Sequence, residues 1–213
     1  MSIKIAPSIL AADFANLEKE IRKVEQAGAD LIHIDVMDGN FVPNITIGAC
    51  VVKDIRKITK LPLEAHLMIK HPECFIDDFV QAGADMVSVH IETISAAQIK
   101  RQAAKLRPKG IKLGVALNPA TALSKIKGVL GCVDFVLIMA VNPGFSGQKF
   151  MPQVLPKIKK LRSMFNAEIA VDGGINDLVA GDLIRAGADI LAVASFIFGC
   201  SDYKQAIERL RNA

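Results

Sequence analysis

A short phrase that ends in Ala-Gly-Ala-Asp occurs three times along the chain, and each time a run of apolar residues follows it. The copies are residues 26–30 (QAGAD), 81–85 (QAGAD) and 185–189 (RAGAD). Glycine is favoured in the left-handed conformation just past the end of a helix, and a short apolar run rich in β-branched residues is typical of a buried parallel strand. Each copy therefore predicts the end of a helix followed by the start of a strand.

The spacing of these copies predicts further strands between them. A degenerate fourth copy lies at residues 130–134 (LGCVD), so that the four glycines, at positions 28, 83, 131 and 187, are 55, 48 and 56 residues apart. This interval is about twice the length of one strand-helix unit. Segments with helical periodicity, such as 16–27 and 76–82, fill the gaps. Short apolar runs supply the additional strands: 3–10, 63–69, 113–118 and 168–173.

Eight strand-helix units of about 27 residues predict a closed parallel barrel, the (β/α)8 or TIM barrel, formed by one domain over residues 1–213. A doubly wound open sheet is the structural alternative. It is disfavoured because it usually has fewer strands and a glycine-rich first turn, whereas the first turn here reads Pro7, Ser8, Ile9, Leu10.

Composition and charge exclude several classes of protein. Apolar residues make up 51% of the chain and charged residues 23%, with a net charge of +4, as in a globular cytoplasmic protein. The densest basic run, residues 157–162, has helical spacing and predicts a solvated helix face, so no nucleic-acid partner is expected. Four scattered cysteines predict reduced thiols, and no apolar run is long enough for a membrane helix.

Four polar residues are predicted to converge at the carboxyl ends of the strands, where barrels of this kind carry their active sites. Side chains alternate along a strand, so His33 and Asp35 share one face, and His66 and Asp172 join them from two other strands. Any one of them alone could be a satisfied polar group of the core. Together they predict a site for one divalent metal ion, Zn²⁺, Mn²⁺, Fe²⁺ or Co²⁺. His90 and Glu92 are candidates for neighbours of this site or for the core.

The placement of the two aspartates predicts a chemistry. Their strands, the second and the seventh, are three steps apart in an eight-stranded ring, about 135° around the axis. One carboxylate could remove a proton from one face of a carbon and the other could return a proton to the opposite face, which inverts that carbon. The metal would polarise a substrate carbonyl and stabilise the enediolate.

A phosphate site is predicted beside the metal from three loops whose backbone N–H groups could bind an anion. These loops contain residues 142–148 (NPGFSGQ), residues 172–174 (DGG) and the pair Ala194-Ser195, which opens a helix. Met37, Met68 and Met139 could line the pocket or fill the core. No lysine is expected at a strand end, which disfavours a Schiff-base aldolase.

Five segments resemble the ribulose-phosphate 3-epimerase family. They are residues 6–14 (APSILAADF), 33–44 (HIDVMDGNFVPN), 64–68 (EAHLM), 141–148 (VNPGFSGQ) and 171–175 (VDGGI), and the resemblance runs from residue 5 to about residue 203. It implies a ribulose-phosphate binding barrel that interconverts D-ribulose 5-phosphate and D-xylulose 5-phosphate in the pentose phosphate or Calvin route. It also implies one divalent metal and a homo-oligomer.

The resemblance also assigns roles to residues. His33, Asp35, His66 and Asp172 match the metal ligands, with Asp35 and Asp172 as proton acceptor and donor in one direction and the reverse in the other. Substrate contacts fall on Ser8, His66, Gly144, Phe145, Ser146, Gly147, Gly173, Gly174, Ala194 and Ser195.

Three residues depart from the family pattern. Ala140 stands where relatives carry Ser or Thr, and Ser146 and Ala194 each replace a glycine. If the backbone at residue 194 needs a positive φ, alanine should weaken phosphate binding by roughly 1 kcal/mol or more, whereas at a negative φ the change should be mild.

Rival functions share part of this residue set. A 3-epimerase of a six-carbon ketose phosphate such as allulose 6-phosphate would use the same catalytic residues in a deeper pocket. A metal-dependent phosphatase or hydrolase would need a poised water instead of two opposed carboxylates. A non-catalytic binding protein would have no need of the acid and base pair.

Overall fold

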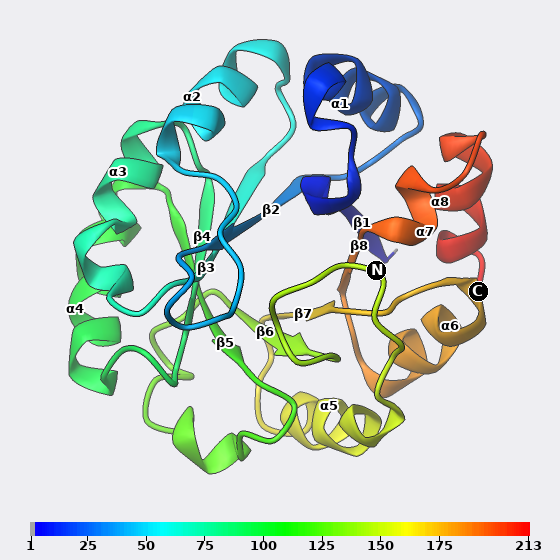
Figure 1. Ribbon diagram of the computed structural model, residues 1–213. Helices are drawn as coiled ribbons and strands as arrows, with labels where there is room; N and C mark the ends of the chain where they lie inside the picture. Colours follow the sequence, from blue (N-terminus) through cyan, green and yellow to red (C-terminus); the bar gives the residue numbers. More distant parts are fainter. Residues whose placement is uncertain (1–2) are drawn as a thin grey trace.

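Eight parallel strands form the centre of the molecule and the helices surround them (Figure 1). The computed structural model describes residues 3–213. The strands are β1 (Lys4–Pro7), β2 (Ile32–Met37), β3 (Leu63–Met68), β4 (Met86–His90), β5 (Lys112–Leu117), β6 (Phe135–Met139), β7 (Glu168–Asp172) and β8 (Ile190–Val193). The α-helices are α1 (Leu17–Gln26), α2 (Ala49–Ile58), α3 (Ile76–Gln81), α4 (Ala96–Leu106), α5 (Leu155–Arg162), α6 (Asp177–Ala186), α7 (Ser195–Phe198) and α8 (Tyr203–Arg211).

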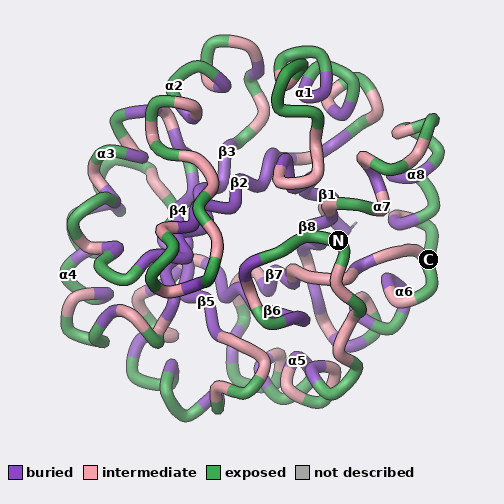
Figure 2. The backbone as a smooth tube through the Cα atoms, in the orientation of Figure 1, coloured by how far each residue is buried: buried purple, intermediate pink, exposed green. Residues whose placement is uncertain are grey.

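The order of the strands in the sheet confirms the predicted (β/α)8 barrel. Each strand pairs in parallel with its neighbours in the order β1-β8-β7-β6-β5-β4-β3-β2. The two end strands meet through the bridge between Ser8 and His33, which nearly closes the ring. Figure 2 shows the buried strands inside and the exposed surface on the outer helices and loops.

The space inside the barrel is filled by side chains on the inward faces of the strands. Phe135 is fully buried there, and Gly114 on β5 makes room for it, because a Cβ at that position would lie 2.4 Å from the Phe135 ring. Ala116, Leu137, Ala170 and Ile190 pack in the same cluster. This packed core supports the polar residues that follow it on the same strand faces.

The sequence repeat corresponds to a backbone clamp between consecutive strands. In all four copies the aspartate N–H donates to the carbonyl of one residue on the preceding strand, and the aspartate carboxylate accepts from the N–H of that same residue. The pairs are Asp30 with Ile5, Asp85 with Leu63, Asp134 with Leu113, and Asp189 with Ile169. The clamps join β1 to β2, β3 to β4, β5 to β6 and β7 to β8, which explains why the phrase recurs every second unit.

An arginine completes three of the four clamps. Arg211, Arg56 and Arg162 each bind the clamp aspartate and also donate to backbone carbonyls nearby. The glycines of these three copies, Gly28, Gly83 and Gly187, have φ angles of 91°, 105° and 108°, as the repeat predicted.

Removing one clamp carboxylate is expected to destabilise the fold. In Asp189→Ala, the N–H of Ile169 at the buried start of β7 and the guanidinium of Arg162 both lose their acceptor, which should lower the free energy of unfolding by about 2 kcal/mol. Urea unfolding measures the change. Asp182→Ala, which removes an exposed pair with Arg185, should change stability by less than about 0.5 kcal/mol. Equal effects of the two substitutions would contradict the clamp.

The fourth copy departs from the predicted alternation of strands and helices. Gly131 does not have a positive φ. Residues 118–134, all of which the structure describes, form turns and the 3-10 helix Leu123–Lys125 in place of an α-helix. The strand predicted over residues 3–10 is also shorter, because Ser8 caps a 3-10 helix at Ile9–Ala11 by accepting a hydrogen bond from the Leu10 N–H.

The prediction that residues 157–162 form a solvated helix face is wrong at both ends of the run, because Arg162 binds the clamp aspartate Asp189 and Lys157 is bound by a loop. The run lies in α5, where Ile158 and Leu161 are buried, but the Lys157 ammonium is half-buried and donates to the carbonyls of Asn118 and Thr121. Lys157 therefore ties α5 to the loop after β5.

The four cysteines are free thiols, as predicted, and Cys50 and Cys74 are exposed. Among residues 3–213, no helix has the length and apolar character needed to cross a membrane.

Candidate active site

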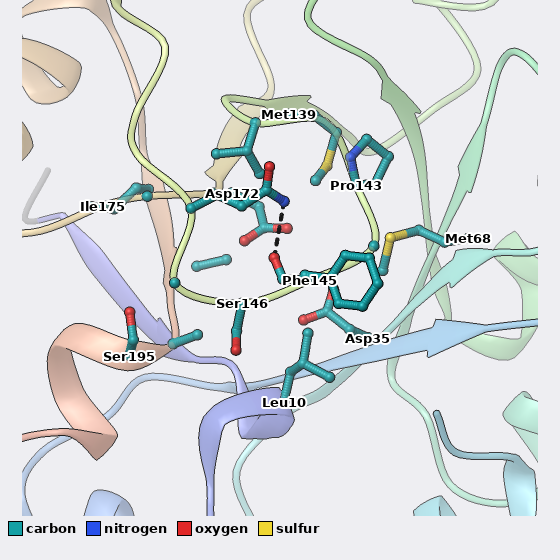
Figure 3. A pocket seen from close by; sticks show the side chains of 18 of the residues that line it. Leu10, Asp35, Met68, Met139, Pro143, Phe145, Ser146, Asp172, Ile175 and Ser195 are labelled. Carbon is teal, nitrogen blue, oxygen red and sulfur yellow. Dashed lines mark hydrogen bonds between the residues drawn. The ribbon is translucent and has the colours of Figure 1, made fainter. Parts of the chain in front are cut away.

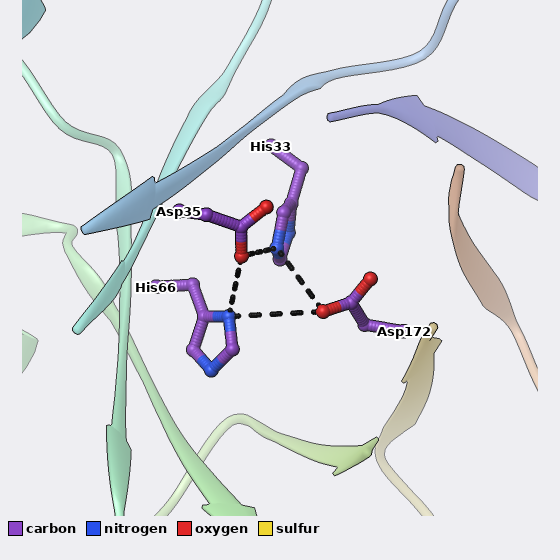
Figure 4. A group of neighbouring side chains, drawn as sticks. All are labelled: His33, Asp35, His66 and Asp172. Atoms are coloured by element: carbon purple, nitrogen blue, oxygen red, sulfur yellow. Dashed lines mark hydrogen bonds and ion pairs between the residues drawn. The ribbon is translucent and has the colours of Figure 1, made fainter. Parts of the chain in front are cut away.

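Two histidines and two aspartates from three strands meet inside the barrel (Figure 4). His33 and Asp35 lie within β2, His66 lies within β3, and Asp172 is the last residue of β7. His33 Nε2 lies 3.1 Å from Asp35 Oδ1, and His66 Nδ1 lies 3.0 Å from the same oxygen. Both ring nitrogens lie 3.9 Å from Asp172 Oδ2. The four ligand atoms are all within 4.8 Å of one another. The structure thus brings together the four residues that the sequence singled out.

This donor set fits a divalent cation. Metal–ligand bonds of 2.0 to 2.1 Å in a tetrahedron require ligand atoms about 3.3 Å apart, and the observed spacings bracket that value. The ring nitrogens that face away from the cluster already have partners. His33 Nδ1 lies 2.9 Å from Glu64 Oε2, and His66 Nε2 lies 2.9 Å from His90 Nε2. Each histidine therefore presents one nitrogen to the cluster.

The electrostatics of the cluster indicate a shortage of positive charge. Burial, and after it the charge of Asp35, raises the pKa of Asp172 to about 6. Burial alone would lower the pKa of His33, but the carboxylates of Asp35 and Glu64 outweigh it and hold that pKa well above its usual value. Asp35, although buried, has a lowered pKa because of His33 and His66. A bound cation would compensate the buried carboxylates directly.

Ser8 extends the cluster from β1. Its hydroxyl donates to Asp35 Oδ2 at 2.5 Å, so that one carboxylate oxygen of Asp35 faces the histidines and the other is held by Ser8. Ser8 directly follows β1 and Asp35 lies in β2, the strand at the other end of the sheet, so this bond also lies across the seam of the barrel.

A pocket of about 480 Å³, its open mouth included, lies above the cluster (Figure 3). Asp35 and Asp172 reach it from β2 and β7. Three methionine side chains also line it, as the sequence allowed: Met37, Met68 and Met139. Eight further residues predicted to contact substrate line it: Gly144, Phe145, Ser146, Gly147, Gly173, Gly174, Ala194 and Ser195. Ser8 and His66, also predicted to contact substrate, are buried and do not line this pocket.

The glycines of the rim have backbone conformations that disfavour a side chain, and two of them also lack the space for one. Gly144, Gly147, Gly173 and Gly174 all have positive φ. A Cβ on Gly174 would lie 2.4 Å from the backbone nitrogen of Phe150, and one on Gly173 would lie 2.5 Å from the Val141 side chain. The loops after β6 and β7 are therefore in direct backbone contact at the pocket wall.

None of the three departures from the family pattern falls at a position with a positive φ. Among the described residues only glycines have positive φ, so Ser146 is unstrained. Ala194 has φ of −99°, which corresponds to the mild outcome expected for alanine there. Ala140 is buried and its N–H donates to the Asp172 carbonyl.

Several residues of the site had no predicted role. Glu64 and Ser88 are fully buried, and the Ser88 hydroxyl donates to Glu64 at 2.8 Å. Asn44, in the loop after β2, donates from Nδ2 to the Gly144 carbonyl at 2.8 Å and so joins two rim loops. Strand alternation could have found Glu64, because it lies two residues before His66. The Asn44 contact joins residues 100 apart and has no local signal in the sequence.

Comparison with known sequences identifies the family. Residues 4–198 match the model of the Ribulose-phosphate 3 epimerase family. The chain belongs to the ribulose-phosphate 3-epimerase family. The ribulose-phosphate 3-epimerase of Bacillus subtilis is 49% identical over 217 aligned positions, which cover 99% of each chain. The chloroplastic ribulose-5-phosphate-3-epimerase of Arabidopsis thaliana is 50% identical over 98% of this chain and 76% of its own length.

Solved structures support the same fold. The 3-hexulose-6-phosphate synthase of Salmonella typhimurium superposes with a TM-score of 0.75 at 19% identity and covers 99% of this chain and 97% of its own. At this identity the likeness concerns the barrel alone. Membership of the ribulose-phosphate 3-epimerase family therefore rests on the sequence matches, and the barrel rests on both.

Proposed function

We propose that this protein interconverts D-ribulose 5-phosphate and D-xylulose 5-phosphate by epimerisation at C3, with one divalent ion at the His33, Asp35, His66 and Asp172 cluster. The observation that carries the proposal is that Asp35 and Asp172 line one pocket from strands three steps apart around the ring. Two opposed carboxyl groups can serve both faces of one carbon, which is the requirement for inversion. The relatives that bear this name support the substrate.

In this mechanism the two aspartates move the proton of C3. Asp35 removes it from one face of D-ribulose 5-phosphate, and Asp172 delivers a proton to the opposite face, with the roles exchanged in the reverse direction. The metal, when bound, polarises the C2 carbonyl and stabilises the negative charge of the enediolate. Ser8 holds Asp35 in place through its 2.5 Å hydrogen bond, and His66 contacts the same carboxylate at 3.0 Å.

The phosphate of the substrate is assigned to the loops after β6, β7 and β8 at the pocket wall. The loops after β6, β7 and β8 offer backbone N–H groups, and their glycines allow the chain to approach an anion closely. The contributing residues are Gly144, Phe145, Ser146, Gly147, Gly173, Gly174, Ala194 and Ser195. Phosphate here and a reacting carbon between the aspartates would orient the sugar along the pocket.

Three finer assignments complete the proposal. The metal is one of Zn²⁺, Fe²⁺, Mn²⁺ or Co²⁺, which suit mixed imidazole and carboxylate ligands. A homo-oligomer is proposed from the family resemblance alone. Sedimentation equilibrium would test it. A cytoplasmic location agrees with the free thiols of Cys50 and Cys74.

The proposal is tested by incubating the metal-loaded protein with D-ribulose 5-phosphate in D₂O. We expect D-xylulose 5-phosphate that carries deuterium at C3, because the proton returned to the second face comes from an acid that exchanges with solvent. NMR follows both the product and the label. Absence of both product and exchange from protein with bound metal would reject the pentose phosphate as substrate, and D-allulose 6-phosphate in the same assay would test a longer sugar. Product without deuterium would contradict the two-aspartate route.

A further inference from the structure

A line of hydrogen-bonded side chains runs from His66 away from the cluster. His66 Nε2 lies 2.9 Å from His90 Nε2, and His90 Nδ1 lies 3.2 Å from Glu92 Oε2. The other carboxylate oxygen of Glu92 accepts from the Asn118 N–H at 2.9 Å and from the Thr121 hydroxyl. His66 and His90 are fully buried. The mechanism above gives neither His90 nor Glu92 a part.

The protons on this line have one consistent order when His66 binds a cation. A metal takes the lone pair of His66 Nδ1, so the proton of a neutral His66 ring is on Nε2 and is donated to His90 Nε2. His90 then carries its own proton on Nδ1 and donates it to the Glu92 carboxylate. Each donor meets one acceptor. The Glu92 carboxylate at the end of the line, when ionised, has no proton and acts only as an acceptor.

The partner of His33 provides an internal comparison. His33 Nδ1 lies 2.9 Å from the Glu64 carboxylate, so a carboxylate acts directly on the ring nitrogen that faces away from the cluster. At His66 the same function would require a carboxylate at the position that the His90 ring occupies. His90 and Glu92 together thus supply to His66 what Glu64 alone supplies to His33.

The His90 ring has two aromatic neighbours. Its centroid lies 5.1 Å from that of the His66 ring at an angle of 22°, which fits two rings joined edge to edge by the Nε2–Nε2 hydrogen bond, and the Phe41 ring packs at 4.8 Å and 55°. Phe41 belongs to the loop after β2, whereas Glu92 is fixed by the loop after β5. Two loops therefore fix the orientation of a ring that touches a metal ligand.

We propose that His90 and Glu92 are positioning residues that hold His66 in the tautomer and orientation whose Nδ1 lone pair faces Asp35 and Asp172, and that they thereby set the metal affinity of the site. The inference rests on the metal site of the proposed function. Partners of this kind typically change metal affinity by about 10- to 100-fold when they are removed.

The test measures the dissociation constant of Co²⁺ for metal-stripped protein by competition with a chelator. His90→Leu, which cannot accept from His66, should bind Co²⁺ about 10- to 100-fold more weakly than the unmodified protein. His90→Gln, whose amide oxygen can accept the same hydrogen bond, should recover most of the loss. In Zn²⁺-loaded protein, ¹⁵N NMR of the histidine rings should place the His66 proton on Nε2, and in His90→Leu that signal should change.

Two further variants separate positioning from a structural role. Glu92→Gln keeps the shape but removes the charge at the end of the line, so it should weaken Co²⁺ binding several-fold. Thr121→Val removes one of the two hydrogen bonds to the other oxygen of Glu92 but keeps its charge and the bond from the Asn118 N–H, so Co²⁺ binding should weaken less than in Glu92→Gln.

The outcomes that would overturn the inference are distinct from failure of the proposed function. A folded His90→Leu with Co²⁺ affinity within about twofold of the unmodified protein would overturn it and leave the metal site intact. If His90→Leu does not fold, an unchanged affinity in Glu92→Gln would overturn it equally. Failure of the unmodified protein to bind Co²⁺ would reject the metal site and this inference together.

Discussion

Asp172→Asn is expected to abolish epimerisation while the C3 proton of D-ribulose 5-phosphate still exchanges with solvent. Asp35 remains able to remove the proton from its own face and return one there, but no acid remains to protonate the opposite face. Loss of a general acid costs about 10² to 10⁴ in rate, so xylulose 5-phosphate formation should fall by at least that range. NMR in D₂O measures deuterium in the recovered ribulose 5-phosphate and the amount of product in one sample.

Asp35→Asn is the matched variant. It should lose exchange from ribulose 5-phosphate but retain exchange from D-xylulose 5-phosphate, where Asp172 is the base. Because both aspartates are proposed metal ligands, the metal content of each variant is measured first, and the asparagine amide oxygen remains available as a ligand. Exchange from the same sugar in both variants, or in neither, would contradict the assignment of one face to each aspartate.

Removal of the metal is expected to have the second large effect. A bound metal should stabilise the negative charge that develops on the substrate by several kcal/mol. Activity of the chelated protein should therefore fall by about 10³ or more. Binding to the folded state alone also stabilises it, by about 2.7 kcal/mol at a free concentration of 100 times the dissociation constant. For a chain of this size that corresponds to a rise in melting temperature of about 5 to 10 °C.

The measurement compares activity and thermal unfolding of chelated protein before and after addition of Zn²⁺, Co²⁺ or Mn²⁺. Both properties should be restored together, since they depend on the same four ligands. Mg²⁺, which prefers an all-oxygen octahedral site, is the control and should restore neither fully. Undiminished turnover in protein shown by elemental analysis to contain no metal would remove the metal from the mechanism.

The barrel could be predicted because its determinants are local in the sequence. The glycine of each of the three close repeats sets a helix end, and the apolar run after it sets a strand, so that β4 (Met86–His90) begins directly after the repeat at residues 81–85. Side chains alternate along a strand, and active sites of such barrels lie at one end. These two rules together predict the set His33, Asp35, His66 and Asp172 from the sequence. Residues on the same strand, or at equivalent places on different strands, are related by simple periodicity.

The remaining features depend on contacts that periodicity does not describe. Residues 118–134 resembled a unit of the repeat, but they form turns where an α-helix was expected, and the clamp of Asp134 is kept without that helix. Lys157 lay in a run that indicated a solvated face, yet three carbonyls of another loop bind its ammonium. Loop conformations and partners far apart in the chain decide these cases.

The paired clamps divide the barrel into four units of two strands each, all at the end opposite the chemistry. A chain reconnected through its natural termini and opened between two pairs, for example between α4 and β5, keeps every clamp intact. A permutant opened within a pair, between α3 and β4, places Asp85 and Leu63 near opposite ends of the new chain. Their clamp then becomes a contact between residues far apart in the sequence. Circular permutants of this fold should thus tolerate new chain ends after every second strand-helix unit, which is the spacing of the sequence repeat.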